Sequence, residues 1–368
     1  MRIGRVAMKP NYEKRWERIA DNLDEKNKDA FVVSEPANCR YLSCSHVPYF
    51  PLVNNIIITR KNKQMALITS LEEFRAKSEC AIADQRVICG YKGIPAYAPT
   101  VSDGLVRTLK KAKCNSVLTD TPLKIKGVKA THDGLVGEMR EVKDSYEMQQ
   151  IREAARITDR SASILESEIM PKAEGRTELQ VGIALDVVLR SQKGVQGTAF
   201  TTIVATNKHG AYSHHDPTDL VLKDGDMVIC DFGIYHNGYC SDMTRTFPVG
   251  DVSEKMVRLH NTVAKSQEVA FKAIKQGASY GDLDRSVREF LRPLKLDRYF
   301  VHSLGHGFGL DVHEGPVLRS QNKDRIKAGT TFTIEPGVYL PGKGGIRIED
   351  DVYMGKRPEW LTHAKRRL

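Results

Sequence analysis

One apolar stretch, VICDFGIYHNGYCSDMTRTF at residues 228–247, most constrains how this chain folds. Asn237-Gly238 near its middle is the strongest short signal for a two-residue type I′ turn, so the stretch predicts a β-hairpin. With that turn, Asp231 faces Thr244. Side chains on a strand alternate between two faces, so Asp231 and Asp242 then share a face as diagonal neighbours, about 7–8 Å apart.

The flanks of both aspartates are apolar, which favours a buried face over two unrelated surface residues. A buried carboxylate is costly unless it is paired or bound to a cation. A three-residue turn would instead put Asp231 and Asp242 on opposite faces. The two-residue turn therefore predicts a site for one cation or for a bridged pair.

Further candidate ligands follow downstream. The segment VHSLGHGFGLDVHEGP, residues 301–316, contains His302, His306 and His313 among glycines that allow close backbone approach. A single histidine in an apolar stretch is more often structural. Three within one glycine-rich segment favour a functional role.

Two acidic residues complete the candidate set. In TFTIEPGVYL, residues 331–340, Glu335 ends an apolar strand before Pro336. In GGIRIEDD, residues 344–351, strand alternation puts Arg347 and Glu349 on one face and the two isoleucines in the core. A solvated outer face is the alternative for the last pair.

Four carboxylates and one imidazole form a hard, oxygen-rich set that balances the charge of two divalent ions. Structural zinc sites prefer Cys and His, whereas carboxylate-rich sites suit manganese and similar ions. Two such ions about 3.5–4 Å apart lower the pKa of a shared water and aim it at a carbonyl. The residues predict metal-assisted hydrolysis.

The rest of the chain predicts two parts. In residues 1–140, apolar runs alternate with helical patterns, which predicts a small α/β domain; the runs are 29–35, 54–60, 64–70, 85–91 and 115–120, and the helical patterns are 12–23 and 102–112. Residues 141–368 predict an α+β domain with four helices. The first covers about 144–169, the third runs from Ser253 to a stop at Gly277, and the fourth lies around 283–291. The second begins at the capping box of Thr177 and contains the apolar residues Leu179, Ile183, Val187 and Val188. Its strands are expected at 200–205, 227–235, 238–247, 331–335 and 345–352.

The motifs together resemble the pita-bread (creatinase/aminopeptidase-like) metallopeptidases, in the branch of prolidase (Xaa-Pro dipeptidase) and aminopeptidase P. They are DFG followed by Asp242, then HGFGLDVHE, IEPGVY and GIRIED, in this order. The resemblance covers residues from about 144 onward, and residues 1–140 resemble the family's creatinase-like N-terminal domain in pattern. It implies an α+β pita-bread catalytic domain, a curved antiparallel sheet flanked by helices, after a smaller α/β domain.

The resemblance also implies a role for each matching residue. The dinuclear metal ligands are Asp231, Asp242, His306, Glu335 and Glu349, with Asp242 and Glu349 bridging and Glu335 also acting as general base. His214 matches the histidine that contacts the scissile peptide. His302 and His313 match those that hold the tetrahedral intermediate, and Arg347 matches an arginine that orients the site or the substrate. The family usually has Pro where this chain has Ser213, and His215 is adjacent, so the His214 assignment is open by one residue.

The implied activity is hydrolysis of Xaa-Pro bonds in small peptides, with prolidase as the first interpretation and aminopeptidase P on longer peptides as the alternative. The implied cofactors are two divalent ions, manganese or cobalt, with zinc and iron as alternatives. A homodimer is implied as well. A non-catalytic binding protein on the same fold is a remote alternative, because such relatives typically lose metal ligands and all five match here.

Composition excludes other classes. The formal charge of +10 is spread among acidic residues, which predicts a solvated surface rather than a nucleic-acid partner. Apolar runs are too short to span a membrane, and the first residues lack a signal-peptide apolar block. Seven scattered cysteines without a CxxC pair favour the reducing cytoplasm over a disulfide scaffold.

Overall fold

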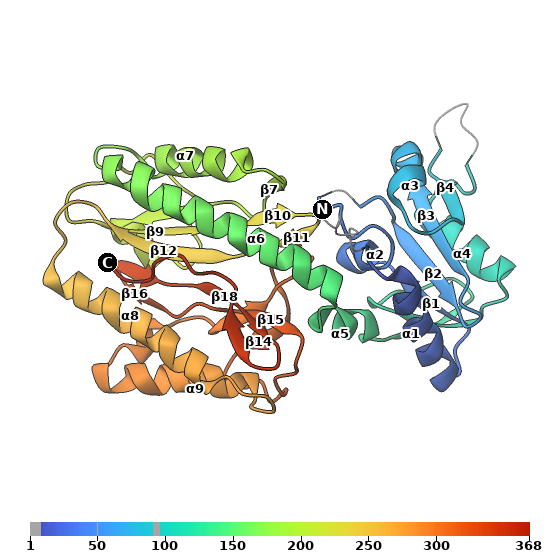
Figure 1. The fold of residues 1–368 in the computed structure, drawn as a ribbon. Helices are drawn as coiled ribbons and strands as arrows, with labels where there is room; N and C mark the ends of the chain where they lie inside the picture. Colours follow the sequence, from blue (N-terminus) through green and yellow to red (C-terminus); the bar gives the residue numbers. More distant parts are fainter. Residues whose placement is uncertain (1–8, 50, 91–95) are drawn as a thin grey trace, which may run out of the picture. The chain divides into compact units, whose positions relative to one another are not determined.

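A computed structural model describes residues 9–49, 51–90 and 96–368 (Figure 1). The chain divides into two compact units, residues 1–140 and 141–368. Within the described ranges, no helix combines the length and the apolarity needed to cross a membrane. All seven cysteines are free.

The first unit is built on a six-stranded mixed sheet in the order β4-β3-β2-β1-β5-β6. Five of its strands confirm the predicted apolar runs: β1 (Ala30–Val33), β2 (Asn55–Thr59), β3 (Gln64–Thr69), β4 (Gln85–Ile88) and β5 (Ser116–Thr119). The end of the predicted run 85–91, at Tyr91, lies outside the described residues. Helices α1 (Tyr12–Glu25) and α4 (Val101–Lys111) confirm the predicted helical patterns.

Four short elements of this unit were not predicted: α2 (Pro36–Ser43), α3 (Glu73–Glu79), α5 (Leu135–Glu141) and β6 (Lys129–His132). The helices have only seven or eight residues each. Two turns of helix are too short for a hydrophobic period to be distinguished from irregular chain, so periodicity alone does not reveal them.

The second unit contains the four predicted helices: α6 (Ser145–Ile164), α7 (Glu178–Ser191), α8 (Glu254–Ala273) and α9 (Tyr280–Leu291). A π-helical turn extends α6 to Ile169. Reciprocal capping boxes begin α6 at Asp144 and α7 at Thr177, and the one at Thr177 confirms the prediction from sequence. Helix α8 ends at Ala273, before the Gly277 that was predicted to stop it.

Three of the four apolar residues that predicted α7 lie outside its buried face, and only Val188 packs against the core. Leu179, Ile183 and Val187 are 43%, 56% and 64% exposed, whereas the buried residues of the helix are Glu178, Val181, Gly182, Leu185 and Leu189. Because α7 carries apolar residues on both sides, the hydrophobic period predicts the helix but does not identify which side packs.

The strands of the second unit pair only in antiparallel fashion within the described residues. They include β8 (Ile203–Thr206), β9 (Met227–Phe232), β10 (Ile234–His236), β11 (Tyr239–Cys240), β12 (Met243–Pro248), β13 (Gly305–Gly307), β14 (Glu314–Leu318), β15 (Thr330–Ile334), β16 (Gly337–Leu340), β17 (Gly344–Arg347) and β18 (Asp350–Met354), with β7 (Val195–Thr198) and β19 (Pro358–Trp360) at two edges. Antiparallel strands with separate helices confirm the predicted α+β class.

Helices cover these strands on two sides (Figure 1). Helices α6 and α7 pack on β8, β9 and β12 through one apolar cluster, and α8 and α9 pack on β15 and β18 through another. Strand β17 lies against β9 and β12. The strands between the helices therefore bring residues 231–248 beside residues 305–349, and the polar side chains of these segments meet there.

Candidate metal centre

The hairpin forms with the predicted register. Asn237 and Gly238 have φ angles of 47° and 83°, the two positive values that a type I′ turn requires. On β9 and β12, the strands before and after this turn, Asp231 pairs with Thr244. Asp231 and Asp242 consequently line the same cavity, as the sequence predicts.

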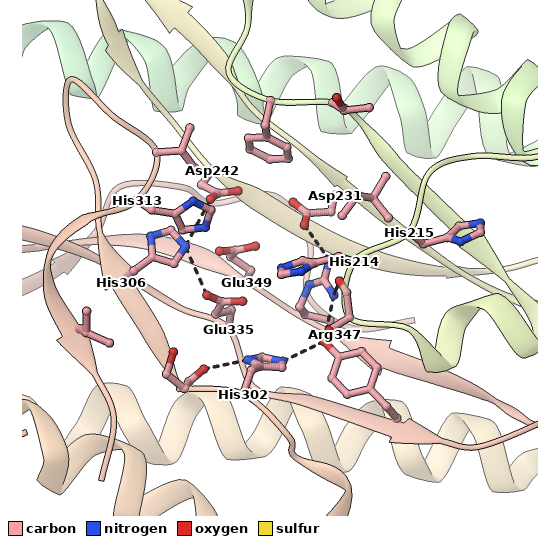
Figure 2. A pocket seen from close by; sticks show the side chains of 18 of the residues that line it. His214, His215, Asp231, Asp242, His302, His306, His313, Glu335, Arg347 and Glu349 are labelled. Carbon is pink, nitrogen blue, oxygen red and sulfur yellow. Dashed lines mark hydrogen bonds and ion pairs between the residues drawn. The ribbon is translucent and has the colours of Figure 1, made fainter. Parts of the chain in front are cut away.

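That cavity has a volume of about 680 Å³ and brings together every predicted site residue: His214, Asp231, Asp242, His302, His306, His313, Glu335, Arg347 and Glu349 (Figure 2). Arg347 and Glu349 are 3% and 2% exposed, which rules out the solvated outer face as their environment. The neighbouring isoleucines, Ile346 and Ile348, lie in the apolar core as predicted.

Three of the five predicted metal ligands form a tight group. Ligand atoms of Asp242, His306 and Glu349 all lie within 4.8 Å of one another. Glu335 joins them through His306, whose Nε2 is 3.3 Å from Glu335 Oε1 and 3.7 Å from Asp242 Oδ2. Asp231 points instead to Arg347, with 2.6 Å between Oδ2 and Nη2 (Figure 2).

The acidic side chains of this group are buried and lie close enough to repel one another. Burial raises the pKa of Glu335 to about 8. Burial, with repulsion from Glu349 and Asp231, raises the pKa of Asp242 well above its usual range, and burial with repulsion from Glu335 and Asp231 does the same for Glu349. Packing acids this closely favours binding of cations, since positive charge relieves both the burial and the repulsion.

Buried oxygens without partners point to the same conclusion. Asp231 Oδ1 and Asp242 Oδ1 are buried and have no hydrogen-bond partner among the described residues. Buried polar atoms are rarely left unsatisfied, and an ion is one explanation when they are. With four carboxylates and one imidazole in reach, the donor set fits divalent cations that prefer oxygen ligands.

His306 is oriented as a ligand. Its Nδ1–H donates to Gly307 O at 3.2 Å. The other ring nitrogen, Nε2, therefore carries the lone pair, and it is directed at Asp242 and Glu335. Burial, and to a smaller extent the neighbouring His313, lowers the pKa of His306 to about 3. The imidazole is therefore neutral at pH 7, which is the form that coordinates metal.

Two threonines that are not among the predicted site residues hold the segment that carries Arg347 and Glu349. Thr244 Oγ1 donates to Glu349 Oε2 at 2.6 Å, and Thr246 Oγ1 donates to Arg347 O at 2.8 Å. Both threonines follow Asp242 at intervals of two along β12. Strand alternation from Asp242 would have placed them on the ligand face.

The Arg347 guanidinium donates hydrogen bonds to four different residues. Besides Asp231, its guanidinium donates to Tyr339 Oη at 2.9 Å, Ser213 O at 3.0 Å and Thr244 Oγ1 at 3.0 Å. Burial alone would lower the pKa of Arg347, but Tyr339 and the carboxylates hold it above the usual range. A guanidinium with four acceptors orients its neighbours and has little capacity to bind anything else.

Both ring nitrogens of His302 are also occupied. Nδ1–H donates to Ser303 O at 2.8 Å, so Nε2 accepts the hydroxyl proton of Tyr339 at 2.9 Å. Burial, followed by Arg347, lowers the pKa of His302 to about 4. Tyr339, which is not among the predicted site residues, thus connects His302 to Arg347.

The adjacent histidines 214 and 215 differ in their contacts. Both line the cavity, but His215 Nε2 donates to the buried Glu178 Oε2 at 2.9 Å. His214 lies near Arg347 in Figure 2, and after burial it is the largest influence that lowers the pKa of His313. Because Glu178 engages His215, His214 is the better candidate for the residue that faces a substrate in this cavity.

A cavity that gathers four carboxylates and several histidines, with His306 beside the acids, is typical of a metal-dependent hydrolase. The chain belongs to metallopeptidase family M24, whose sequence profile matches residues 149–356. It is a metallopeptidase, and its α+β fold is the pita-bread fold of that family.

Three relatives illustrate the similarity. The Xaa-Pro dipeptidase of Pyrococcus furiosus is 30% identical over 97% of this chain and 99% of its own length. The structure of the Xaa-Pro dipeptidase from Bacillus anthracis is similar with a TM-score of 0.85 and 27% identity, over 97% of this chain and 99% of that one. The X-Pro aminopeptidase from Thermotoga maritima gives 0.84 and 31%, over 96% and 99%.

Proposed function

We propose that this protein is a dinuclear metal-dependent Xaa-Pro dipeptidase. One observation carries the proposal: a single cavity gathers Asp231, Asp242, His306, Glu335 and Glu349, the five residues whose motifs resemble the metal ligands of this branch. The full-length similarity to Xaa-Pro dipeptidases from Pyrococcus furiosus and Bacillus anthracis supports it.

The five residues would hold two divalent ions, with Asp242 and Glu349 shared between them. Manganese or cobalt fits the oxygen-rich donors best. When bound, the two ions supply an activated water and polarise the scissile carbonyl. The tight grouping of Asp242, His306 and Glu349 within 4.8 Å supports a shared ligand set.

The remaining chemistry belongs to the side chains around them. Glu335 takes the proton of the attacking water and delivers it to the departing proline nitrogen. His214 and His313 face the cavity and donate to the oxyanion that develops on the substrate. His302 acts through Tyr339, because both of its ring nitrogens are already hydrogen-bonded, and Arg347 orients Asp231.

A site of this kind suits a bond to proline. The Xaa-Pro amide carries no N–H, so an enzyme that reads that donor handles it poorly. Activation of the carbonyl and shape of the cavity do not need the donor. Phe200, Val312 and Val317 line the same cavity and supply apolar surface for the pyrrolidine ring or the preceding side chain.

A second candidate is aminopeptidase P, which releases the first residue from longer peptides. The similarity to the Thermotoga maritima X-Pro aminopeptidase favours it as the alternative. The two activities differ in whether the far side of the cavity accommodates only the carboxylate of a dipeptide or a continuing chain.

A substrate panel tests the proposal. The protein is treated with a chelator, reloaded with Mn²⁺ or Co²⁺, and assayed on Leu-Pro, Ala-Pro, Leu-Pro-Gly and the proline-free control Leu-Ala. The dipeptidase cleaves the Xaa-Pro dipeptides only after reloading and leaves Leu-Pro-Gly intact. Cleavage of Leu-Pro-Gly alone assigns the aminopeptidase instead, and cleavage of neither refutes both.

We further propose the accompanying organisation: residues 1–140 as a creatinase-like domain, residues 141–368 as the catalytic domain, a homodimer, and a cytoplasmic location. Seven free cysteines support a reducing compartment. Sedimentation velocity of the intact chain tests the homodimer, for which a single species at the monomer mass is the contrary result.

A further inference from the structure

A second cluster of ligand-type side chains lies beside the candidate metal centre. Glu178, His209 and His215 offer atoms within 4.8 Å of one another. Glu178 is fully buried at the first turn of α7, and the two histidine rings are 4.3 Å apart between centroids. The proposed reaction uses none of the three residues.

The contacts of Glu178 explain the cluster as a hydrogen-bonded anchor. Its Oε1 accepts from Thr206 N at 2.8 Å and from His209 Nδ1 at 3.1 Å. Its Oε2 accepts from His215 Nε2 at 2.9 Å, and from the backbone N and the Oγ1 of Thr218 at 3.1 and 2.8 Å. One carboxylate therefore collects donors from four residues along one segment.

Five hydrogen bonds occupy the two carboxylate oxygens, so an ion would have to displace donors to bind there. All of these distances fall in the ordinary range of N–H···O and O–H···O bonds. Burial on its own raises the pKa of Glu178, but the bonds from Thr206, His215, Thr218 and His209 outweigh it and lower the pKa below its usual value. Glu178 is thus an ionised, saturated acceptor.

The anchored segment forms one wall of the catalytic cavity. Thr206 is the last residue of β8, and Thr218 follows the residues that line the cavity. Glu178 therefore holds both ends of residues 207–217, and also His209 and His215 within them. Residues 213–216 line the cavity, and His214 is among them. Residues 212–217 belong to no helix or strand, so side-chain anchors must fix their position.

We propose that Glu178 is a positioning residue, which clamps residues 207–218 and thereby holds His214 at the reacting peptide bond. This inference rests on the proposed peptidase function. A shift of about 1 Å in a group that contacts the substrate can cost up to roughly 100-fold in rate. Glu178 acts on the reaction without touching the substrate.

The decisive experiment is a double-mutant cycle on the Mn²⁺-loaded protein. Glu178→Gln keeps the shape of the side chain but replaces one acceptor oxygen by a donor. It is expected to lower kcat on Leu-Pro roughly 10- to 100-fold in wild type, and to have almost no further effect on His214→Ala. An equal loss in both backgrounds would mean a merely structural role and overturn the proposal.

Glu147→Gln is the matched control. Glu147 is likewise buried in the first turn of a helix, where it closes the capping box of α6, and it does not line the cavity. Its replacement is expected to lower stability without changing kcat. If Glu178→Gln does not fold, His209→Gln takes its place in the cycle, because it removes one donor to the same carboxylate. The expected loss of kcat is then smaller, and it should again be almost absent in the His214→Ala background.

Two further readouts do not depend on the substrate. Hydrogen exchange is expected to increase in residues 207–218 of Glu178→Gln and to stay unchanged in β9. The metal content is expected to equal that of wild type, and loss of an ion would overturn the proposal and assign the cluster to a metal site. If wild type does not cleave Leu-Pro, the proposed function fails while the exchange data still test the anchor.

Discussion

Arg347 Nη2 and Asp231 Oδ2 lie 2.6 Å apart inside the protein, although the two residues are 116 positions apart in the sequence. The side chains are 3% and 12% exposed. The guanidinium also donates to Tyr339, Ser213 and Thr244, so it fixes the aspartate in a network rather than in an isolated pair. The network therefore holds the Asp231 side chain in a fixed position beside the cavity.

Replacing Arg347 by Met is expected to destabilise the metal-free protein by about 3–5 kcal/mol, because Asp231 is left buried without compensation. Added Mn²⁺ is expected to restore more stability to this variant than it adds to wild type, since a divalent ion supplies the missing charge. Urea unfolding with and without Mn²⁺ measures both effects. Arg347→Lys, which keeps the charge, is the control, and an equal loss in both variants would contradict the electrostatic explanation.

Glu335→Gln is expected to lower kcat on Xaa-Pro dipeptides by about 10²–10⁴-fold, because the amide cannot accept the proton of the attacking water. The exposed Glu174→Gln is the control and should retain wild-type kcat. Metal content is measured on the same preparations. A variant that binds its full metal complement and still turns over normally would remove Glu335 from the role of general base.

Gly233 joins β9 to β10 two residues after Asp231, and a Cβ there would be 2.0 Å from the carbonyl oxygen of Ser241, the residue before Asp242. Gly233→Ala is expected to force the strands apart, with a cost of about 1–3 kcal/mol and weaker Mn²⁺ binding. In Gly182→Ala, by contrast, the new Cβ meets its nearest neighbour, Pro217, at an ordinary 3.5 Å. Unchanged Mn²⁺ titration of Gly233→Ala would show that strand spacing does not set the site.

His260 gives a prediction of pH dependence. Burial lowers its pKa to about 4, and one ring nitrogen, Nδ1, has no partner among the described residues. In the unfolded chain the His260 imidazole takes up a proton near pH 6.5, whereas in the folded protein it does so only near pH 4. The free energy of unfolding therefore decreases as the pH falls from about 6.5 toward 4. The full loss corresponds to about 3 kcal/mol.

His260→Phe keeps a ring in the space and is expected to weaken this dependence. The difference in unfolding free energy between wild type and variant should change between pH 7 and pH 5 in favour of the variant. Replacement of the exposed His132 by Gln serves as the control. Parallel curves for wild type and His260→Phe would exclude the buried imidazole as the cause.

The hairpin could be predicted because its register depends on local chemistry. Asn237-Gly238 selects the turn, the turn fixes the pairing, and the pairing places Asp231 and Asp242 on one face. The same period of two correctly separated Arg347 and Glu349 from the isoleucines in the core. These inferences use only neighbours along the chain or across one turn.

Contacts between distant segments could not be predicted in this way. The periods assign a face to Arg347 but do not name Asp231 or Tyr339 as its partners. Nothing near Glu178 in the sequence indicates that it binds His215. On α7, apolar residues on both sides left the packed face undetermined, and Leu179 proved to be exposed. Tertiary packing decides such cases.

The candidate ligands extend from β9 to the residue just before β18, so the centre is complete only when segments from residue 231 to residue 349 have come together. While the nascent chain leaves the ribosome, the hairpin emerges long before Glu335 and Glu349 do. Contacts over such separations form late, because long loops must close first. Retention of a cation therefore reports that the last strands have docked, and a chain that stalls earlier exposes acidic side chains without an ion to neutralise them.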